Sequence, residues 1–130
     1  MMTTVHALIW SGILTFAMLV LGLVLRTQAW SPSGLMIAFS DRETVVAPLG
    51  IGGRADRAAN NQIEAMVMFL AVVLAASIAG KAPQAAMGAT VFFWARLVYW
   101  PVYLAGIPVL RTLVWLVSIV GLILILKEIW

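Results

Sequence analysis

Long apolar runs limit what this chain can fold into. Residues 5–25 are almost entirely apolar and carry no Asp, Glu, Lys or Arg. A helix needs about 20 such residues to cross the hydrocarbon core of a bilayer. Over the 130-residue chain 64% of residues are hydrophobic and 10% are charged, whereas soluble domains carry about 25% charged residues. The sequence therefore predicts an integral membrane protein with a single domain over residues 1–130.

The first apolar run is predicted to stay in the protein as a membrane span. It is longer than the apolar part of a secretory signal peptide, and no Lys or Arg precedes it. Arg26 follows it in place of a small-residue cleavage site. Trp10 near its start and Trp30 beyond its end suit the aromatic belts of a membrane interface.

Three further apolar segments predict an all-α bundle of four membrane-spanning helices. The expected spans are about residues 5–25, 61–79, 85–105 and 110–126. Gly80 with Pro83, and Gly106 with Pro108, are typical of helix ends and turns. One long loop is expected over about residues 26–60, and a loop of that length in a small protein is usually functional or disordered.

The distribution of basic residues predicts the orientation. Four spans place both termini on the same side of the membrane. Five arginines lie on the side of the long loop and only two lysines on the other: Arg26, Arg42, Arg54, Arg57 and Arg111 against Lys81 and Lys127. Because basic residues favour the cytoplasmic side, we expect a cytoplasmic loop and both termini outside.

Composition excludes several classes of function. The chain has no cysteine and one histidine, His6, so disulfides, thiol catalysis by the protein and histidine clusters for metals are excluded. The net charge of +3 is dispersed, without the basic patch of a nucleic-acid-binding protein. Residues 50–53, Gly-Ile-Gly-Gly, precede a predicted helix but lack the spacing and the Lys-Ser/Thr ending of a phosphate-binding P-loop. The two adjacent glycines, Gly52 and Gly53, would allow a sharp turn or close approach to a ligand.

Arg57, Asn61 and Glu64 form the first candidate binding site. Their spacing of i, i+4 and i+7 places them on one face of a helix that continues into an apolar span. Charged groups at such a position need a partner or water. They would either clamp an anionic ligand or lock helices together, with Glu64 paired to Arg96 and Arg57 to Asp56 or lipid phosphate.

Arg96, Tyr99 and Tyr103 form the second candidate, at i, i+3 and i+7 of the third span. An arginine in mid-span must face protein or water. The three side chains would line a polar cleft for a small molecule, or the two tyrosines would belong to an aromatic belt at the headgroups.

Arg26 and Arg111 each lie at a predicted cytoplasmic helix end. They either orient the helices in the membrane or provide a cation that stabilises a bound anion or thiolate.

Two of these motifs, in order and on successive helices, resemble the MAPEG family, the membrane-associated proteins of eicosanoid and glutathione metabolism. The resemblance rests on Arg57-x-x-x-Asn61-x-x-Glu64 and on Arg96-x-x-Tyr99-x-x-x-Tyr103 followed by Arg111, and it covers essentially the whole chain. Ala65 departs from the family, in which eicosanoid-forming members carry a tyrosine after the glutamate. The interval from Tyr103 to Arg111 is also one residue longer and contains Pro108.

The resemblance implies a homotrimer that binds glutathione between neighbouring protomers, most like the short bacterial members and hence in a bacterial inner membrane. It implies glutathione contacts for six residues: Arg57, Asn61, Glu64, Arg96, Tyr99 and Tyr103, the last three from a neighbour. It further implies that Arg26 lies where the eicosanoid-forming members carry an arginine that favours the thiolate, the nucleophilic form of a thiol, and Arg26 and Arg111 are the candidate catalytic residues.

The function expected from the sequence is a glutathione-dependent transferase or peroxidase acting on hydrophobic electrophiles or lipid hydroperoxides. Its partners are other copies of the chain, membrane lipids and a hydrophobic small-molecule substrate. The alternative is a non-enzymatic MAPEG-fold membrane protein with a structural or interaction role. A small multidrug transporter would need an acidic residue deep in its first helix, and residues 5–25 contain none.

Overall fold

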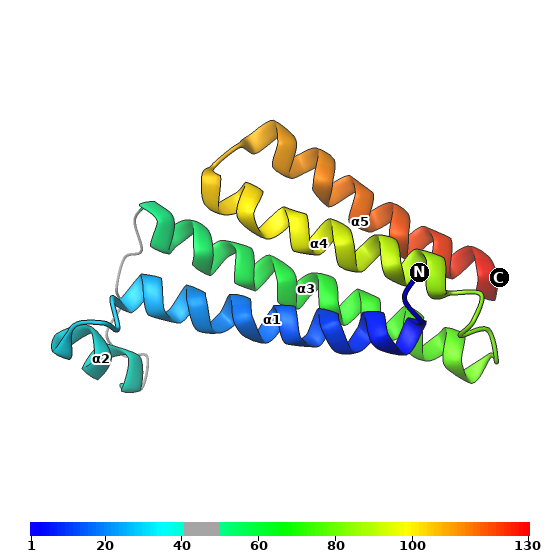
Figure 1. Cartoon of the computed structure of the whole chain (residues 1–130), viewed down its shortest axis with the longest axis horizontal. Helices are drawn as coiled ribbons and strands as arrows, with labels where there is room; N and C mark the ends of the chain where they lie inside the picture. Colours follow the sequence, from blue (N-terminus) through cyan, green and yellow to red (C-terminus); the bar gives the residue numbers. More distant parts are fainter. Residues whose placement is uncertain (41–49) are drawn as a thin grey trace.

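The computed structural model describes residues 1–40 and 50–130, which fold into helices joined by short turns. The five helices are α1 (Thr4–Thr27), α2 (Pro32–Phe39), α3 (Gly50–Ile78), α4 (Ala86–Ala105) and α5 (Pro108–Ile129). The predicted all-helical class is confirmed, and the residues described contain no strand. Figure 1 shows the four long helices side by side in the order α1, α3, α4, α5, with both termini at the same end.

Three of these helices, α1, α3 and α5, are long and apolar enough to cross a membrane. The predicted span over residues 85–105 is present as α4, but α4 does not reach the same apolar character. Arg96 and several Tyr and Trp residues lower its hydropathy. α4 contacts α1, α3 and α5, so much of its surface is shielded by protein. A fourth membrane span is therefore not confirmed by the helix itself.

The loop expected over residues 26–60 is much shorter in the structure, because it contains α2 and the first turns of α3. Ser31 caps α2 by accepting a hydrogen bond from the Gly34 N–H, and Pro32 takes the first helical position. This Ser-Pro pair is typical of a helix start, although the sequence analysis expected a loop over these residues. Residues 41–49, which include Arg42 of the orientation count, lie outside the residues described.

Small residues allow the helices to approach closely at two crossings. Gly52 and Gly53 lie inside α3 and not in a turn. A Cβ on Gly52 would lie 2.9 Å from the Leu25 carbonyl oxygen of α1, and one on Gly88 of α4 would lie 2.6 Å from the Gly121 carbonyl oxygen of α5. Glycine is thus needed at both places for backbone contact, which is common between helices in membranes.

The core lies between α1, α3 and α4. Phe69 of α3 and Phe92 of α4 are fully buried and stack with ring centroids 4.1 Å apart. Met18 of α1 is buried in the same cluster. This packing fixes the rotation of α3 and α4 about their axes, and so decides which polar side chains meet one turn or two farther along.

Candidate functional site

Arg96 is the centre of a polar cluster between α3 and α4. Its side chain is fully buried in mid-helix. Its Nε donates a hydrogen bond to Gln62 Oε1 at 2.7 Å, and its Nη2 donates to Asn61 Oδ1 at 2.9 Å. The Nη1 atom is buried and has no hydrogen-bond partner among the residues described. A buried cation with only neutral partners is costly, so this cluster favours an additional acceptor or anion.

The hydrogen bonds continue from Arg96 to the first helix. Gln62 is fully buried, and its Nε2 donates to Thr15 Oγ1 of α1 at 3.1 Å. Thr15 Oγ1 in turn donates to the Ser11 carbonyl oxygen at 2.7 Å. Side chains from α1, α3 and α4 thus form one connected polar network, which holds the guanidinium of Arg96 in a fixed place.

A row of cations and phenols extends from Arg96 toward the turn between α4 and α5. The Arg96 Cζ lies 4.2 Å from the centroid of the Tyr99 ring. The rings of Tyr99 and Tyr103 meet edge to face, 5.4 Å between centroids, and the Arg111 Cζ lies 4.8 Å from the Tyr103 ring. The second predicted stripe and Arg111 therefore form one continuous row of contacts, in which each guanidinium faces the negative side of a ring.

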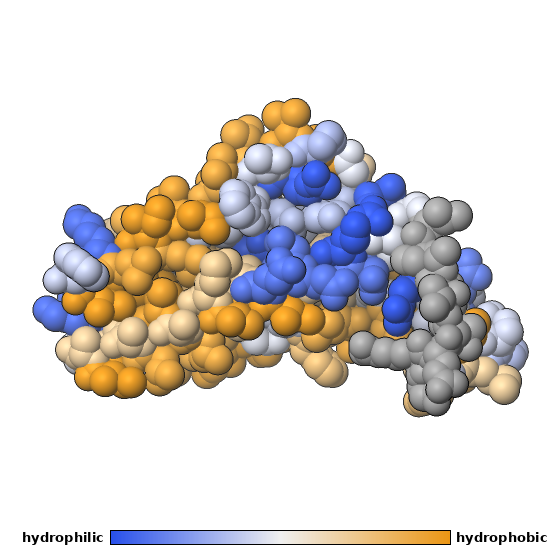
Figure 2. Space-filling view, turned by 180° about the vertical axis from the view of Figure 1, so that it is seen from behind, coloured by the Kyte–Doolittle hydropathy of each residue, from blue (hydrophilic) through white to orange (hydrophobic). Residues whose placement is uncertain are grey.

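The first predicted stripe lies beside this row. Asn61 touches Arg96, while Arg57 and Glu64, on the same face of α3, are exposed. Figure 2 shows hydrophilic side chains gathered in a band on one face of the molecule, toward the end of the bundle at which α3 begins. Arg54 of α3 adds a further cation at this end, where its Nε donates to the Leu104 carbonyl oxygen at 2.9 Å.

The structure does not contain the two ion pairs considered for the locking alternative. Arg96 bonds Gln62 and Asn61 in place of Glu64. Asp56 faces Arg26 in place of Arg57, with 3.8 Å between Arg26 Nε and Asp56 Oδ1. Asn61 and Arg96 also meet within one chain, although the resemblance implied that the third-helix residues come from a neighbour.

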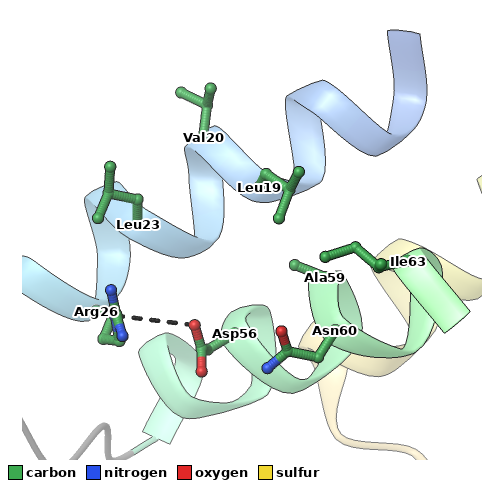
Figure 3. A pocket seen from close by; sticks show the side chains of 8 residues that line it. All are labelled: Leu19, Val20, Leu23, Arg26, Asp56, Ala59, Asn60 and Ile63. Atoms are coloured by element: carbon green, nitrogen blue, oxygen red, sulfur yellow. Dashed lines mark ion pairs between the residues drawn. The ribbon is translucent and has the colours of Figure 1, made fainter. Parts of the chain in front are cut away.

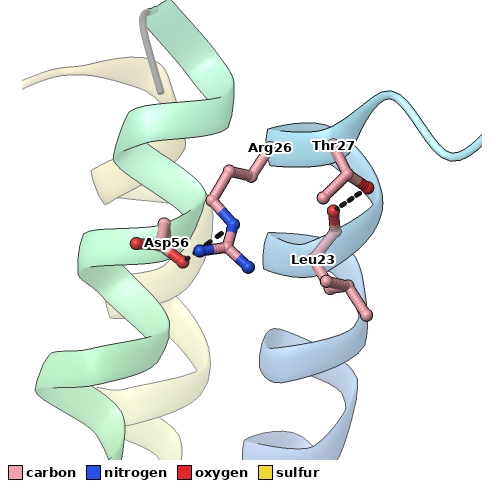
Figure 4. Close-up of polar contacts among 4 residues, drawn as sticks. All are labelled: Leu23, Arg26, Thr27 and Asp56. Atoms are coloured by element: carbon pink, nitrogen blue, oxygen red, sulfur yellow. Dashed lines mark hydrogen bonds and ion pairs between the residues drawn. The ribbon is translucent and has the colours of Figure 1, made fainter. Parts of the chain in front are cut away.

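Arg26 lies apart from the other candidates. Figure 4 shows it at the end of α1, directed toward Asp56 of α3. In the described part of the chain α1 makes no contact with α5, the helix of Arg111. The two candidate catalytic arginines, one of which was expected to stabilise a thiolate or another anion, are thus not brought together within one protomer.

Two residues of the network, Gln62 and Thr15, were not singled out from the sequence. Thr15 is a polar side chain in the middle of a predicted span, whereas Gln62 lies among other polar residues at the start of one. A polar residue deep in a predicted span is itself a signal for a partner on another helix. The described residues contain no cluster of three or more His, Asp or Glu side chains that would hold a metal ion.

The helices and this cluster define an integral membrane protein with a cationic, hydrogen-bonded site between its helices. No curated protein and no solved structure matches the chain. A family model, that of the MAPEG family, matches residues 7–128, and the chain belongs to this family. The resemblance found from the two motifs is thereby confirmed.

Proposed function

We propose that this protein is a glutathione-dependent transferase or peroxidase of the membrane, acting on hydrophobic electrophiles or lipid hydroperoxides. The observation that carries the proposal is the buried Arg96 with its unpartnered Nη1, next to a row of cations and phenols. Such a surface suits a small, flexible molecule with more than one carboxylate. Membership of the MAPEG family supports glutathione as that molecule.

Each residue of the two stripes has a role in this proposal. Arg57, which is exposed, pairs with one glutathione carboxylate, and Glu64 binds the amino group. Asn61 binds the peptide part and is held in place by its hydrogen bond from the buried Arg96, while Tyr103, packed against the buried Tyr99, forms the wall of the site.

Arg111 is proposed as the cation beside the glutathione sulfur, because it already lies against Tyr103. A neighbouring positive charge favours the thiolate, which attacks the electrophile. We do not give Arg26 this role, since it pairs with Asp56 and lies on α1, which does not contact α5 in the described chain.

The proposed assembly is a homotrimer in a bacterial inner membrane, with α4 as the fourth span, both termini outside and the connection before α3 in the cytoplasm. Exposed apolar side chains on α1 and α5 give each protomer a surface for lipid or for another copy. Glutathione would bind at the end of the site that faces the cytoplasm.

Glutathione binding to the protein in detergent, measured by calorimetry, tests the proposal. Wild type should bind saturably, and Arg57→Ala and Glu64→Ala should each weaken binding roughly tenfold or more, the effect of losing one charge-assisted contact. Lys127→Ala, which removes a cation at the other end of the bundle, is the matched control. An assembled wild type that does not bind glutathione would contradict the proposal.

A non-enzymatic role is the second candidate, favoured by one observation. Arg96 is already held by Gln62 and Asn61 with no exposed surface, as in a structural lock. The two candidates differ in turnover: a transferase consumes glutathione when a hydrophobic electrophile is added, and the consumption falls in Arg111→Gln. Binding without any consumption across electrophiles and hydroperoxides would favour the non-enzymatic role.

A further inference from the structure

A groove between α1 and α3 lies apart from the Arg96 cluster. Its volume is about 420 Å³, within the range of roughly 300–1,000 Å³ of small-molecule sites. The wall from α1 consists of Leu19, Val20, Leu23 and Arg26, and the wall from α3 of Asp56, Ala59, Asn60 and Ile63. Figure 3 shows the charged pair at one end of the groove and apolar side chains such as Leu19 and Ile63 toward the other.

Arg26 and Asp56, the charged residues at one end of the groove, make no hydrogen bond to each other. The 3.8 Å between Arg26 Nε and Asp56 Oδ1 is too long for a hydrogen bond, and Arg26 Nε is buried without a hydrogen-bond partner in the described chain. Both side chains are about one-third exposed, so each keeps a free side toward the groove. The groove therefore offers a cation and an anion to one ligand, with the Asn60 amide next to them.

Two apolar stripes extend from the groove along the helices. On α1 the exposed residues are spaced at helical intervals away from Val20: Phe16, Ile13 and Ile9. On α3 they are spaced in the same way away from Ile63: Val67, Leu70 and Leu74. Since α1 and α3 run antiparallel in Figure 1, both stripes extend in the same direction from the charged end. An acyl chain that starts in the groove would have an apolar surface along its length.

The charged end lies where a headgroup would be. Arg26 is one residue from the end of α1, and the short helix α2 follows after one turn. α2 exposes Leu35, Met36 and Phe39, and Trp30 before it is exposed as well. Exposed aromatic and apolar residues on a short helix beside a span are typical of the membrane interface.

We infer that this groove binds a zwitterionic phospholipid with a primary ammonium headgroup. The lipid phosphate pairs with Arg26, and the ammonium donates hydrogen bonds to Asp56 and the Asn60 side-chain oxygen. The acyl chains lie along the apolar stripes of α1 and α3. A choline headgroup has no N–H to donate to Asp56, and a glycerol headgroup has no cation, so both fit less well. This inference does not depend on the proposed glutathione chemistry.

Native mass spectrometry of the detergent-purified protein, titrated with phospholipids that share the same acyl chains, tests the inference. We expect wild type to retain the ethanolamine lipid roughly tenfold better than the choline or glycerol lipid, the effect of one charge-assisted contact. Asp56→Asn, nearly identical in shape, should abolish this preference. Glu128→Gln, which also removes one carboxylate but lies at the end of α5, should keep it. Equal retention of all three headgroups by wild type would overturn the inference.

A second variant separates a lipid from another protomer as the occupant. Val20→Trp fills the groove and should reduce lipid retention several-fold while the oligomeric state by light scattering stays unchanged. Dissociation of the assembly by Val20→Trp would show that another copy fills the groove, and would overturn the inference. Because Asp56 is outside the proposed glutathione site, Asp56→Asn should keep glutathione affinity. If excess glutathione displaced the lipid from wild type, the groove would be a glutathione site and the inference would fail.

Discussion

Arg96 and Arg26 show two ways in which this protein places an arginine beside α3. Arg96 is fully buried in the middle of α4, with two hydrogen bonds to side chains of α3 and a tyrosine ring against its plane. Arg26 lies near the end of α1, about one-third exposed, with a carboxylate 3.8 Å away and no hydrogen bond to it. The neutral partners thus hold their arginine more firmly than the oppositely charged partner holds its own.

The difference follows from where each arginine can find solvent. A guanidinium in the middle of a helix bundle has no access to water or headgroups, so the protein must provide its acceptors. One at a helix end can extend to the interface and needs little from the protein. The comparison therefore predicts that the stability of the protein depends strongly on the contacts of Arg96 with α3 and weakly on those of Arg26.

The largest effect is expected for Arg96→Ala. It removes a fully buried side chain and leaves the Asn61 and Gln62 amide oxygens without their donor, which should lower the free energy of unfolding by about 3–5 kcal/mol. Thermal unfolding in detergent measures the change. Arg96→Lys keeps the charge, but the lysine cannot reach both acceptors. Its free energy of unfolding should therefore lie between those of Arg96→Ala and wild type. A melting temperature unchanged in Arg96→Ala would show that the cluster is not a structural centre.

A smaller effect is expected for Gln62→Leu. This variant keeps the size of the side chain but removes one acceptor of Arg96 and the donor to Thr15, at a cost of about 1–3 kcal/mol. Thr15→Val, which removes only the Thr15 hydroxyl, should cost less than Gln62→Leu. Denaturant or thermal unfolding of both variants and of the double variant measures their coupling. If the two effects simply added, the bond between Gln62 and Thr15 would not be part of the network.

The smallest effect is expected for Arg26→Gln. Ion pairs with this much exposure contribute about 0–1 kcal/mol, so the free energy of unfolding should change by less than about 1 kcal/mol. The measurement is the same unfolding experiment in detergent at low and at high salt. If Arg26→Gln lowered the free energy of unfolding as much as Arg96→Ala does, the two arginines would not differ in their contribution to stability.

The apolar pattern of the sequence was sufficient to find the four long helices but not their ends. Residues 5–25 predicted most of α1, whereas α3 begins at Gly50, before the predicted polar first part of this helix, which included Arg57. The glycines at its beginning matched a turn signal and hid the helical pattern, although Gly52 lies inside the helix and allows close contact with α1. α2 was missed because its Ser-Pro start also matches a turn signal.

The candidate site was predicted in its residues but not in its contacts. Helical spacing placed Asn61 on one face with Arg57 and Glu64, and Tyr99 on one face with Tyr103. It did not predict the contact between Asn61 and Arg96. It did not predict whether Arg96 would meet Gln62 or Glu64, because these are two residues apart and point in different directions from the helix axis. Only the packing of Phe69 on Phe92 fixes that rotation, and a single sequence does not show how two helices pack. Gln62 and Arg26 were therefore the least predictable parts of the site.

The lower apolar character of α4 has a consequence for how the chain is made. An arginine at the centre of a helix adds about 2.5–3.5 kcal/mol to the free energy of insertion from the translocon into the bilayer. α4 leaves the ribosome after α3 and is joined to α5 by the short turn at Gly106 and Ile107. We expect α4 and α5 to enter the membrane together as a hairpin, once Asn61 and Gln62 of α3 are already in place to receive Arg96. The order of the helices along the chain thus lets biosynthesis provide the acceptors before the cation arrives.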